Sequence, residues 1–459
     1  MSEVEESTYD PNKVDAYARH LAKVNESKQV VATQDICNDQ GAILIKAGQP
    51  ITGKTTERIV KFKLLKPIEE SVAIEGDIDG SALFKHIKAI LSKNEVAIKI
   101  HEQLELESAL KNLCHFYQTF PILRQKITVL SLQMKRVYTQ SLFSAWVVTV
   151  IGNQMNLPKV EMENLFIAAI AHDIGMLHID EEVINKKGGL TPEEWRQIYA
   201  HPIIGEKILQ NIPGIEKETM RAVREHHERC DGTGYPRGKF EKELAIHGQI
   251  IAMADSVVAI LARMRSEGRN FRDLIPVIQI NSQAHFQGTY EALVLVLRKA
   301  NLGDEGIISH DAMPGFIDRV LFINKFLSEW LHVSEEHIMA LGFTHQNRKL
   351  HMIQTVLMNV AIAVRGAGIL DEGYIRFLEQ VKSDQLEFAY REIEDVYIML
   401  SEIRFHLDRL ERFIKEFLEF QEKPDKEMEE GLRKALASIT GVREKYADGD
   451  PAKYNVEAS

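Results

Sequence analysis

The sequence predicts a mainly α-helical fold with a small β-rich module near the N-terminus and further helices at the C-terminus. After residue 80 the apolar residues recur at spacings of three and four, which is the period of an amphipathic helix. Between residues 29 and 80 short β-rich runs alternate with turns rich in Gly, Asn and Asp, which is typical of small hairpins.

Length and composition limit the possible functions. The chain has 459 residues, of which 45% are hydrophobic, so two or three domains with buried cores are expected. The formal net charge is -11 and there is no strongly basic block, so duplex nucleic acid is not an expected partner. A small anionic ligand remains possible, because bound metal ions can reverse the local potential.

Cysteine usage and apolar runs indicate a location. The three cysteines, Cys37, Cys114 and Cys230, are far apart and odd in number, which fits a reducing compartment rather than a disulfide framework. The start of the chain is acidic and has no apolar run, so no signal peptide is expected. Apolar stretches such as 142–151 are too short to span a bilayer. We therefore expect a cytoplasmic protein without a membrane partner.

We expect six segments along the chain. They are a polar, flexible N-terminus (1–28), a β-rich module (29–80), a helical connector (81–124), a metal-binding domain (125–288), a C-terminal helical region (289–445) and a flexible tail (446–459). In the module, strands are expected at 30–32 and 42–45 and a short helix at 55–63. The apolar spacing over 393–414 predicts an amphipathic helix, which leaves packing within its own domain and homodimerisation both open.

The run from His226 to Pro236 carries the strongest chemical signal. It begins with two adjacent histidines and a glutamate, and neutral imidazole is the commonest metal ligand in proteins. Its second half holds Asp231, Gly232, Gly234, Tyr235 and Pro236, and this combination of Gly and Pro excludes a helix. The run therefore predicts a rigid loop placed beside a metal site.

Further ligand-type residues occur in or beside predicted helices. In chain order they are His172, Asp173, His201, His226, His227 and Asp255. Asp255 lies within an apolar helical stretch, and a buried carboxylate must be paired or must coordinate a cation. Any one of these residues alone fits an ordinary structural role, but their conjunction does not.

Six mixed imidazole and carboxylate ligands exceed what one metal ion needs. A pair of ions about 3.5–4 Å apart can use all six, with one carboxylate bridging them. Asp173 is the natural bridge, since its neighbour His172 can bind one of the ions. Such a pair lowers the pKa of bound water towards about 7 and neutralises a phosphate, which suits phosphodiester hydrolysis.

The same residues resemble the HD-GYP family of metal-dependent phosphohydrolases, a branch of the HD superfamily. The likeness is carried by His172-Asp173-Ile174-Gly175, 186–194, His201-Pro202 with Gly205, His226-His227-Glu228, 231–236 and Ala254-Asp255. It covers about a third of the chain, from about residue 125 to 270. Residues 29–73 also resemble a module that precedes some HD-GYP domains.

The resemblance implies a helical domain that binds two or three iron or manganese ions and cleaves cyclic di-GMP. On this basis the six residues become the metal ligands, Asp173 also has a catalytic role, and two metal ions are expected here. The loop with Tyr235 would shape the nucleotide pocket or contact protein partners. The C-terminal helices are a second candidate for protein contacts.

The sequence departs from the family at three positions. Where the family offers a Glu ligand and, one turn later, a His ligand, this chain has Arg136 and Gln140. Arg cannot bind a metal, and a Gln amide is a poor substitute for imidazole. The lysine of the family's HD-x-G-Lys motif is replaced by Met176. Two functions therefore stay open: a cyclic di-GMP phosphodiesterase with a reduced site, which is slightly favoured, and a catalytically impaired signalling or binding module.

Overall fold

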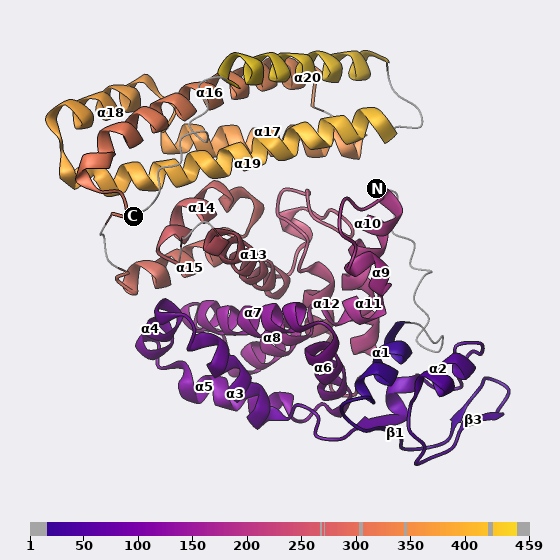
Figure 1. Cartoon of the computed structure of the whole chain (residues 1–459). Coiled ribbons are helices and arrows are strands. Elements are labelled where there is room, and N and C mark those ends of the chain that lie inside the picture. The colour runs from indigo at the N-terminus through magenta and orange to yellow at the C-terminus, as the bar shows by residue number, and fades with distance from the viewer. Residues whose placement is uncertain are drawn as a thin grey trace. The chain divides into compact units, whose positions relative to one another are not determined.

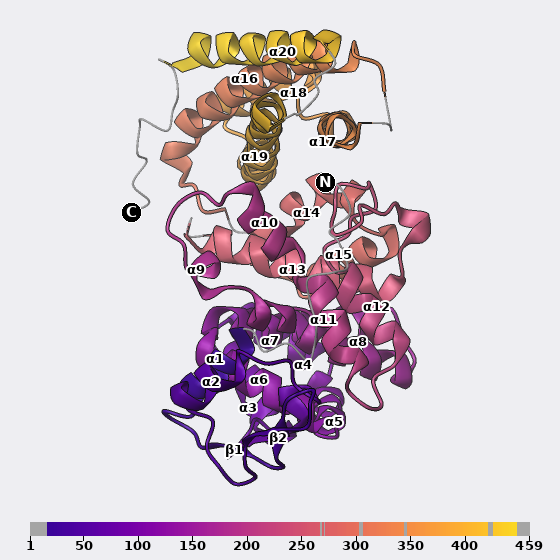
Figure 2. The same cartoon turned by 90° about the vertical axis from the view of Figure 1, so that its right-hand side faces the viewer.

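The computed structural model describes residues 16–266, 269, 271–302, 306–343, 347–420 and 426–447. Within these residues the fold is mainly α-helical, and the strands all lie before residue 75, as the sequence predicts. The chain divides into two compact units (Figures 1 and 2). One unit comprises Ser2–Arg263 and His285–Asn301, and the other comprises Met264–Ala284 and Leu302–Ser459. The segment boundaries expected from the sequence remain predictions.

The N-terminal module consists of two short antiparallel strand pairs. Strand β1 (Val30–Ala32) pairs with β4 (Val72–Ile74), and β2 (Ile36–Cys37) pairs with β3 (Ile43–Ile45). The turn between β2 and β3 is held by Asn38, whose side-chain oxygen accepts from the backbone N–H of Gln40 and of Ala42. The expected strands at 30–32 and 42–45 are thus present.

The helix expected at 55–63 is present as α2 (Gly53–Ile59) but ends earlier. Thr52 caps its N-terminus in a capping box with Thr55. The helix ends because the following residues pair with β2: Lys63 accepts from the N–H of Asp39, and the N–H of Leu65 donates to Cys37. Backbone groups used in this pairing are not available to a helix.

The expected flexible N-terminus is wrong for residues 16–24. These residues form helix α1 (Ala16–Val24), and Tyr17, Leu21 and Val24 on one face are buried. Their spacing of four and three places them on the side that packs against α6 and α2. Arg19 and Lys23 are exposed and His20 is buried beside the apolar residues, so an average over composition hides this short apolar stripe. Residues 1–15 and 448–459, where flexible ends were also expected, lie outside the described residues.

The helices of the first unit form the body that carries the histidine motifs. After α1 and α2 they are α3 (Gly80–Leu91), α4 (Glu95–Gln103), α5 (Leu106–Tyr117), α6 (Pro121–Gln133), α7 (Lys135–Gln154), α8 (Lys159–Ala171), α9 (Glu181–Ile184), α10 (Pro192–Tyr199), α11 (His201–Gln210), α12 (Lys217–Glu225), α13 (Ile246–Ser266) and α15 (Gln287–Lys299). Helix α8 packs against α7 and α12, and α11 packs against α12. Helix α10 begins with a capping box formed by Thr191 and Glu194.

A buried ion pair connects the N-terminal module with the helical body. Lys126 of α6 is fully buried, and its Nζ lies 3.2 Å from a carboxylate oxygen of Glu69. The same Nζ lies 3.1 Å from Nε2 of His178 and 3.4 Å from the ring centre of Tyr17. His178 ends the short 3-10 helix η2 (Ile174–His178), which follows Asp173 directly. The module is therefore packed against the segment that leads out of the HD motif.

The second unit is a helical bundle. Its helices are α14 (Leu274–Ile280), α16 (Met313–Met339), α17 (Arg348–Ala367), α18 (Glu372–Asp384), α19 (Tyr390–Phe420) and α20 (Lys426–Tyr446). Helix α19 contains the stretch 393–414 that the sequence predicted as amphipathic. Its apolar face, including Ile393, Leu400 and Leu407, is fully buried in the core of this unit. This burial accounts for the apolar face without a partner chain.

Two helices are long and apolar enough to cross a membrane by length and composition, contrary to the expectation from the longest apolar runs. They span Ile246–Met264 and Lys349–Ala367. About half of each stretch, 50% and 56%, is buried inside the structure, as is also common for core helices of globular units.

Candidate metal centre

The site begins where the apolar helix α8 ends. Residues 165–171 are all buried, and His172 and Asp173 follow immediately at the end of the helix. The chain then turns through η2, where Gly175 packs directly against the backbone of His201 at the start of α11. A side chain at position 175 would collide with the backbone carbonyl oxygen of His201. The glycine of the HD motif therefore permits the close approach that brings His201 to Asp173.

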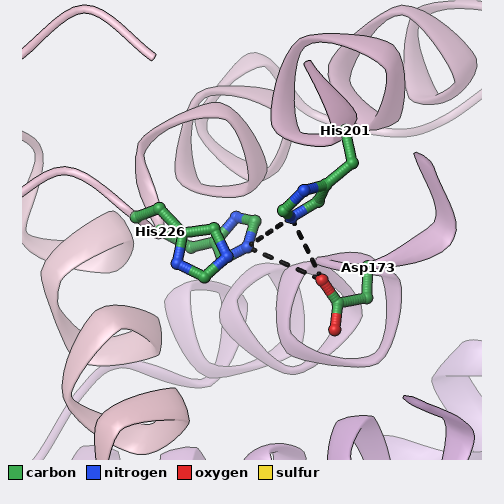
Figure 3. A group of neighbouring side chains, drawn as sticks. Asp173, His201 and His226 are labelled. Atoms are coloured by element: carbon green, nitrogen blue, oxygen red, sulfur yellow. Dashed lines mark hydrogen bonds and ion pairs between the residues drawn. The ribbon is translucent and has the colours of Figure 1, made fainter. Parts of the chain in front are cut away.

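One carboxylate lies between imidazoles from different parts of the chain (Figure 3). Oδ1 of Asp173 lies 3.1 Å from Nε2 of His201 and 3.9 Å from Nε2 of His226. Its Oδ2 lies 3.2 Å from Nε2 of His172. Asp173, His201, His226 and His227 each offer one ligand atom, and these atoms all lie within 4.8 Å of one another.

Three of the imidazoles are oriented in the same way. Each donates its Nδ1–H to the backbone carbonyl three residues earlier in the chain. The pairs are His172 with Ala169 at 2.8 Å, His201 with Ile198 at 2.7 Å, and His226 with Val223 at 2.5 Å. Such hydrogen bonds fix the ring and its tautomer, so that the Nε2 lone pair is directed into the site.

This orientation fits a cation. Nε2 of His201 and Nε2 of His226 lie 3.2 Å apart, and neither carries a hydrogen in the tautomer that the backbone carbonyls select. Two lone pairs at this distance repel each other unless a positive charge lies between or beside them. Nε2 of His172 is also buried, and it lies 3.2 Å from Oδ2 of Asp173. A cluster of imidazole and carboxylate ligands matches a borderline divalent metal, so the residues present fit such an ion.

The charge states of Asp173, His226 and His227 are those of metal ligands, whereas His172 carries a proton. Burial and the neighbouring imidazoles hold the pKa of His226 and of His227 well below the usual value, so both rings are neutral at pH 7. Burial opposes ionisation of Asp173, but His172 and His201 hold its pKa well below the usual range. Burial likewise lowers the pKa of His172, but the adjacent Asp173 overcomes this and raises it to about 9. A cation at the site would take over the place of that proton.

Asp255 lies beside the same cluster. It projects from α13, and its Oδ2 lies 3.8 Å from Nδ1 of His227. Burial, together with the charge of Asp173, raises the pKa of Asp255. The six residues singled out from the sequence thus form one connected group. Their individual roles as ligands remain predictions.

The loop after the histidine pair is built around one glycine. At Gly234 a Cβ would lie within 2.5 Å of Cα of Glu228 and of the carbonyl oxygen of His227, so only glycine fits. The next residue, Tyr235, donates its N–H to that carbonyl at 3.1 Å and precedes Pro236 through a cis peptide bond. Its ring stacks on His227 at 4.5 Å between centres. The loop therefore covers the ring of His227.

The first half of the loop is an Asx turn. Oδ1 of Asp231 accepts from the N–H of Thr233 at 2.9 Å and from its hydroxyl at 2.7 Å. Gly232 adopts a left-handed conformation with φ of 76°. Asp231 and Gly232 thus shape the loop backbone. A direct contact of these residues with substrate remains a prediction.

Two buried glutamates hold the loop, and the sequence reasoning did not identify their role. Glu228 accepts from the backbone N–H of Arg237 at 2.7 Å and of Lys239 at 2.9 Å. Glu225 accepts from Nζ of Lys239 at 2.7 Å and from the N–H of Ala245 at 2.8 Å. A signal was available, since Glu225 and Glu228 flank two adjacent histidines, and a carboxylate buried beside them requires partners. The partners themselves lie too far along the chain to be read from the sequence.

The three residues that depart from the HD-GYP pattern differ in solvent exposure. Arg136 on the first turn of α7 is exposed, and Gln140 one turn later is partly buried. Met176 lies in η2 and is also partly buried. The effect of Gln140 and Met176 on metal or substrate binding remains a prediction.

Comparison with known proteins identifies the domain that carries the site. Residues 122–289 match the family model described as HD domain. This part of the chain is an HD domain, and its motifs are those of the HD-GYP type.

The relatives found each match about a quarter of this chain. A cyclic di-GMP phosphodiesterase of Thermotoga maritima is 40% identical over 120 residues, which cover 26% of this chain and 32% of the relative. A 3'3'-cGAMP-specific phosphodiesterase (number 3) of Vibrio cholerae is 35% identical over 127 residues, covering 28% of this chain and 26% of the relative. The cyclic di-GMP phosphodiesterase response regulator RpfG of Xanthomonas campestris is 34% identical over 114 residues, covering 24% and 30%. This chain thus matches about a third or less of the length of these relatives.

A solved HDG"Y"P protein from Bdellovibrio bacteriovorus aligns with 15% identity and a TM-score of 0.30. The alignment covers 59% of this chain and 94% of the other. At this TM-score the likeness adds no argument about the fold.

Proposed function

We propose that the HD domain hydrolyses a phosphodiester bond of a cyclic dinucleotide, with cyclic di-GMP as the first candidate. The observation that carries this proposal is the position of Asp173 between His172 and His201, with the Nε2 atoms of His201 and His226 facing each other at 3.2 Å. Relatives of this chain are named as phosphodiesterases of cyclic di-GMP or 3'3'-cGAMP, which supports the substrate class.

The donor set divides naturally between two positions. Asp173, His201, His226 and His227 would hold one iron or manganese ion, and these four already cluster. His172, Asp173 and Asp255 would hold a second ion with room for water and substrate. When bound, the metal pair supplies an activated water and positive charge opposite the phosphate. The chain itself contributes the fixed imidazole orientations, the carboxylate shared between positions, and the loop with Tyr235 that shields His227 from solvent.

A direct assay tests the proposal. Protein loaded with manganese or ferrous iron is incubated with cyclic di-GMP and, separately, with 3'3'-cGAMP, and the products are resolved by chromatography. We expect linear dinucleotide or mononucleotide to form, and Asp173→Asn to abolish product formation. Metal-loaded protein that forms no product from either substrate at high enzyme concentration would refute hydrolysis of these compounds.

A second function is supported by specific residues. Gln140 and Met176 stand where the family has an imidazole ligand and a phosphate-binding lysine, which favours a module that binds a cyclic dinucleotide or a protein partner without turnover. Retained binding of cyclic di-GMP in calorimetry, together with no product and fewer than two metal ions per chain, would select this alternative. Contacts to partner proteins through the Tyr235 loop or the C-terminal helices, a homodimer and a cytoplasmic location remain proposals without a structural test.

A further inference from the structure

The N-terminal module exposes an apolar row beside β2. Cys37 is paired with Ile43 across the hairpin, and its carbonyl also accepts from the N–H of Leu65 on the other side. Residues directly opposite each other in antiparallel pairing project from the same face. The side chains of Ile43 and Leu65 therefore lie on one face with Cys37 between them. They are 47% and 56% exposed, which is unusual for large aliphatic residues in a paired segment.

The segment after α2 extends this row. Val60 and Phe62 are 37% and 42% exposed, whereas Leu64 is buried and anchors the segment to the module. The exposed apolar residues alternate with exposed lysines at positions 61, 63 and 66. The backbone pairing of Lys63 with Asp39 and of Leu65 with Cys37 holds this arrangement in place. We call Ile43 together with residues 60–66 the basic apolar surface.

Positive charge predominates in the segment that carries this surface, although Asp35 and Asp39 lie beside it. Residues 42–66 contain six Lys or Arg residues and one Glu, although the chain has a net charge of -11. The six cations are all exposed: Lys46, Lys54, Arg58, Lys61, Lys63 and Lys66. A cluster of four to eight such residues beside exposed apolar side chains matches the recognition of anionic lipid.

We propose that the basic apolar surface docks the protein onto an anionic lipid bilayer. The apolar side chains protrude singly between lysines, and a bilayer interface accepts such side chains without needing complementary pockets. Lysines beside them keep their ammonium groups at the level of the phosphates. The expectation of no membrane partner was based on the lack of a spanning segment, and this surface concerns peripheral docking. The proposal does not depend on the hydrolytic activity of the HD domain.

Vesicle co-sedimentation of the full chain tests the proposal. The vesicles consist of phosphatidylcholine alone or with about one third phosphatidylglycerol. We expect binding only to the anionic vesicles. The double variant Lys61→Glu/Lys66→Glu should bind at least about 25-fold more weakly, at about fivefold for each lysine lost. Ile43→Ser/Leu65→Ser should also weaken binding although every charge is kept.

Matched controls use exposed residues elsewhere in the same unit. Lys111→Glu and Val160→Ser change the same residue types away from this surface and should bind like the unchanged protein. Circular dichroism melting checks that each variant is folded. Absence of binding to anionic vesicles, or equal binding by all folded variants, overturns the proposal. Binding to polyglutamate but not to vesicles, lost in Lys61→Glu/Lys66→Glu, overturns it in favour of an acidic protein partner.

Discussion

Oδ1 of Asp173 lies 3.1 Å from Nε2 of His201, although Asp173 follows the end of helix α8 and His201 begins helix α11. The contact exists because Gly175 lets η2 pack directly on the start of α11. The hydrogen bond from Nδ1 of His201 to Ile198 then directs its Nε2 towards the carboxylate. Local backbone geometry thus orients the ring of His201 towards Asp173.

Removing the shared carboxylate should remove the metal. In Asp173→Asn the amide loses the charge that lies between His172 and His201, and a neutral amide is a weak ligand for borderline metals. We expect manganese affinity to fall by more than the roughly 10–100-fold typical of losing a residue that merely orients a ligand. The readout is metal per chain by mass spectrometry after dialysis. Glu182→Gln, an exposed carboxylate nearby, is the control and should keep its metal. Equal metal content in both variants would show that Asp173 is not a ligand.

Restoring the family residues at two positions should raise turnover. The double change Gln140→His and Met176→Lys would return an imidazole donor and a cation for the phosphate. If these losses limit activity, the rate with cyclic di-GMP should rise at least about tenfold, equivalent to about 1.4 kcal/mol of barrier. Gln140→His alone tests the effect of the added imidazole on metal content. Met176→Lys alone tests the effect of the added charge on KM. Unchanged rates in the double variant, with both side chains present in a folded protein, would contradict this interpretation of the departures.

The histidine motifs could be predicted from the sequence because their spacing is local. His172-Asp173 follows an apolar helix, His201-Pro202 opens one, and His226-His227 ends one, so the sequence indicates their elements. The amphipathic helix over 393–414 could also be predicted, because its apolar residues recur at spacings of three and four over a long stretch. That the motifs meet at one site could not be predicted from local spacing. That prediction was based on the family resemblance and on the ligand types.

Other features depend on pairs far apart in sequence. The burial of Lys126 against Glu69 could not be read locally, since a lysine is normally exposed and its partner lies 57 positions away. The contacts of Glu228 with Arg237 and Lys239 arise only once the loop has folded back. Helix α1 was missed because its apolar stripe is short and surrounded by polar residues. In each case the burial or the contact depends on tertiary packing, which local composition does not specify.

The loop glycine should be essential for loop geometry. In Gly234→Ala the new methyl group would collide with the backbone of His227 and Glu228, which cannot move as a flexible side chain could. We expect a loss of about 1–3 kcal/mol in unfolding free energy, as for other overpacked sites. Displacement of Tyr235 from His227 should also raise KM for the cyclic dinucleotide. The control is Gly189→Ala, because a Cβ there meets nothing within 4 Å. Urea unfolding and steady-state kinetics give the two readouts, and equal values for the two variants would contradict the proposed constraint.

A buried histidine should make stability fall in mild acid. His285 is only 7% exposed, and its Nδ1 makes no hydrogen bond to any described residue. Burial, together with the nearby charge of Arg229, lowers its pKa to about 3. In the unfolded chain the same imidazole takes up a proton near pH 6.5, so between about pH 6.5 and pH 3 the unfolded state binds more protons. Stability is therefore fully present above pH 6.5 and is lost progressively as the pH falls.

The variant His285→Gln isolates this contribution. Glutamine does not titrate, so the unfolding free energy of the unchanged protein should fall by about 2 kcal/mol more than that of the variant between pH 7 and pH 5. Urea unfolding of both proteins at pH 8, where the imidazole is neutral in both states, sets the baseline for this difference. All other carboxylates and histidines are shared and cancel in the comparison. Parallel pH profiles for the two proteins would mean that the pKa of His285 is similar in the folded and unfolded states. Burial would then not disfavour its protonation.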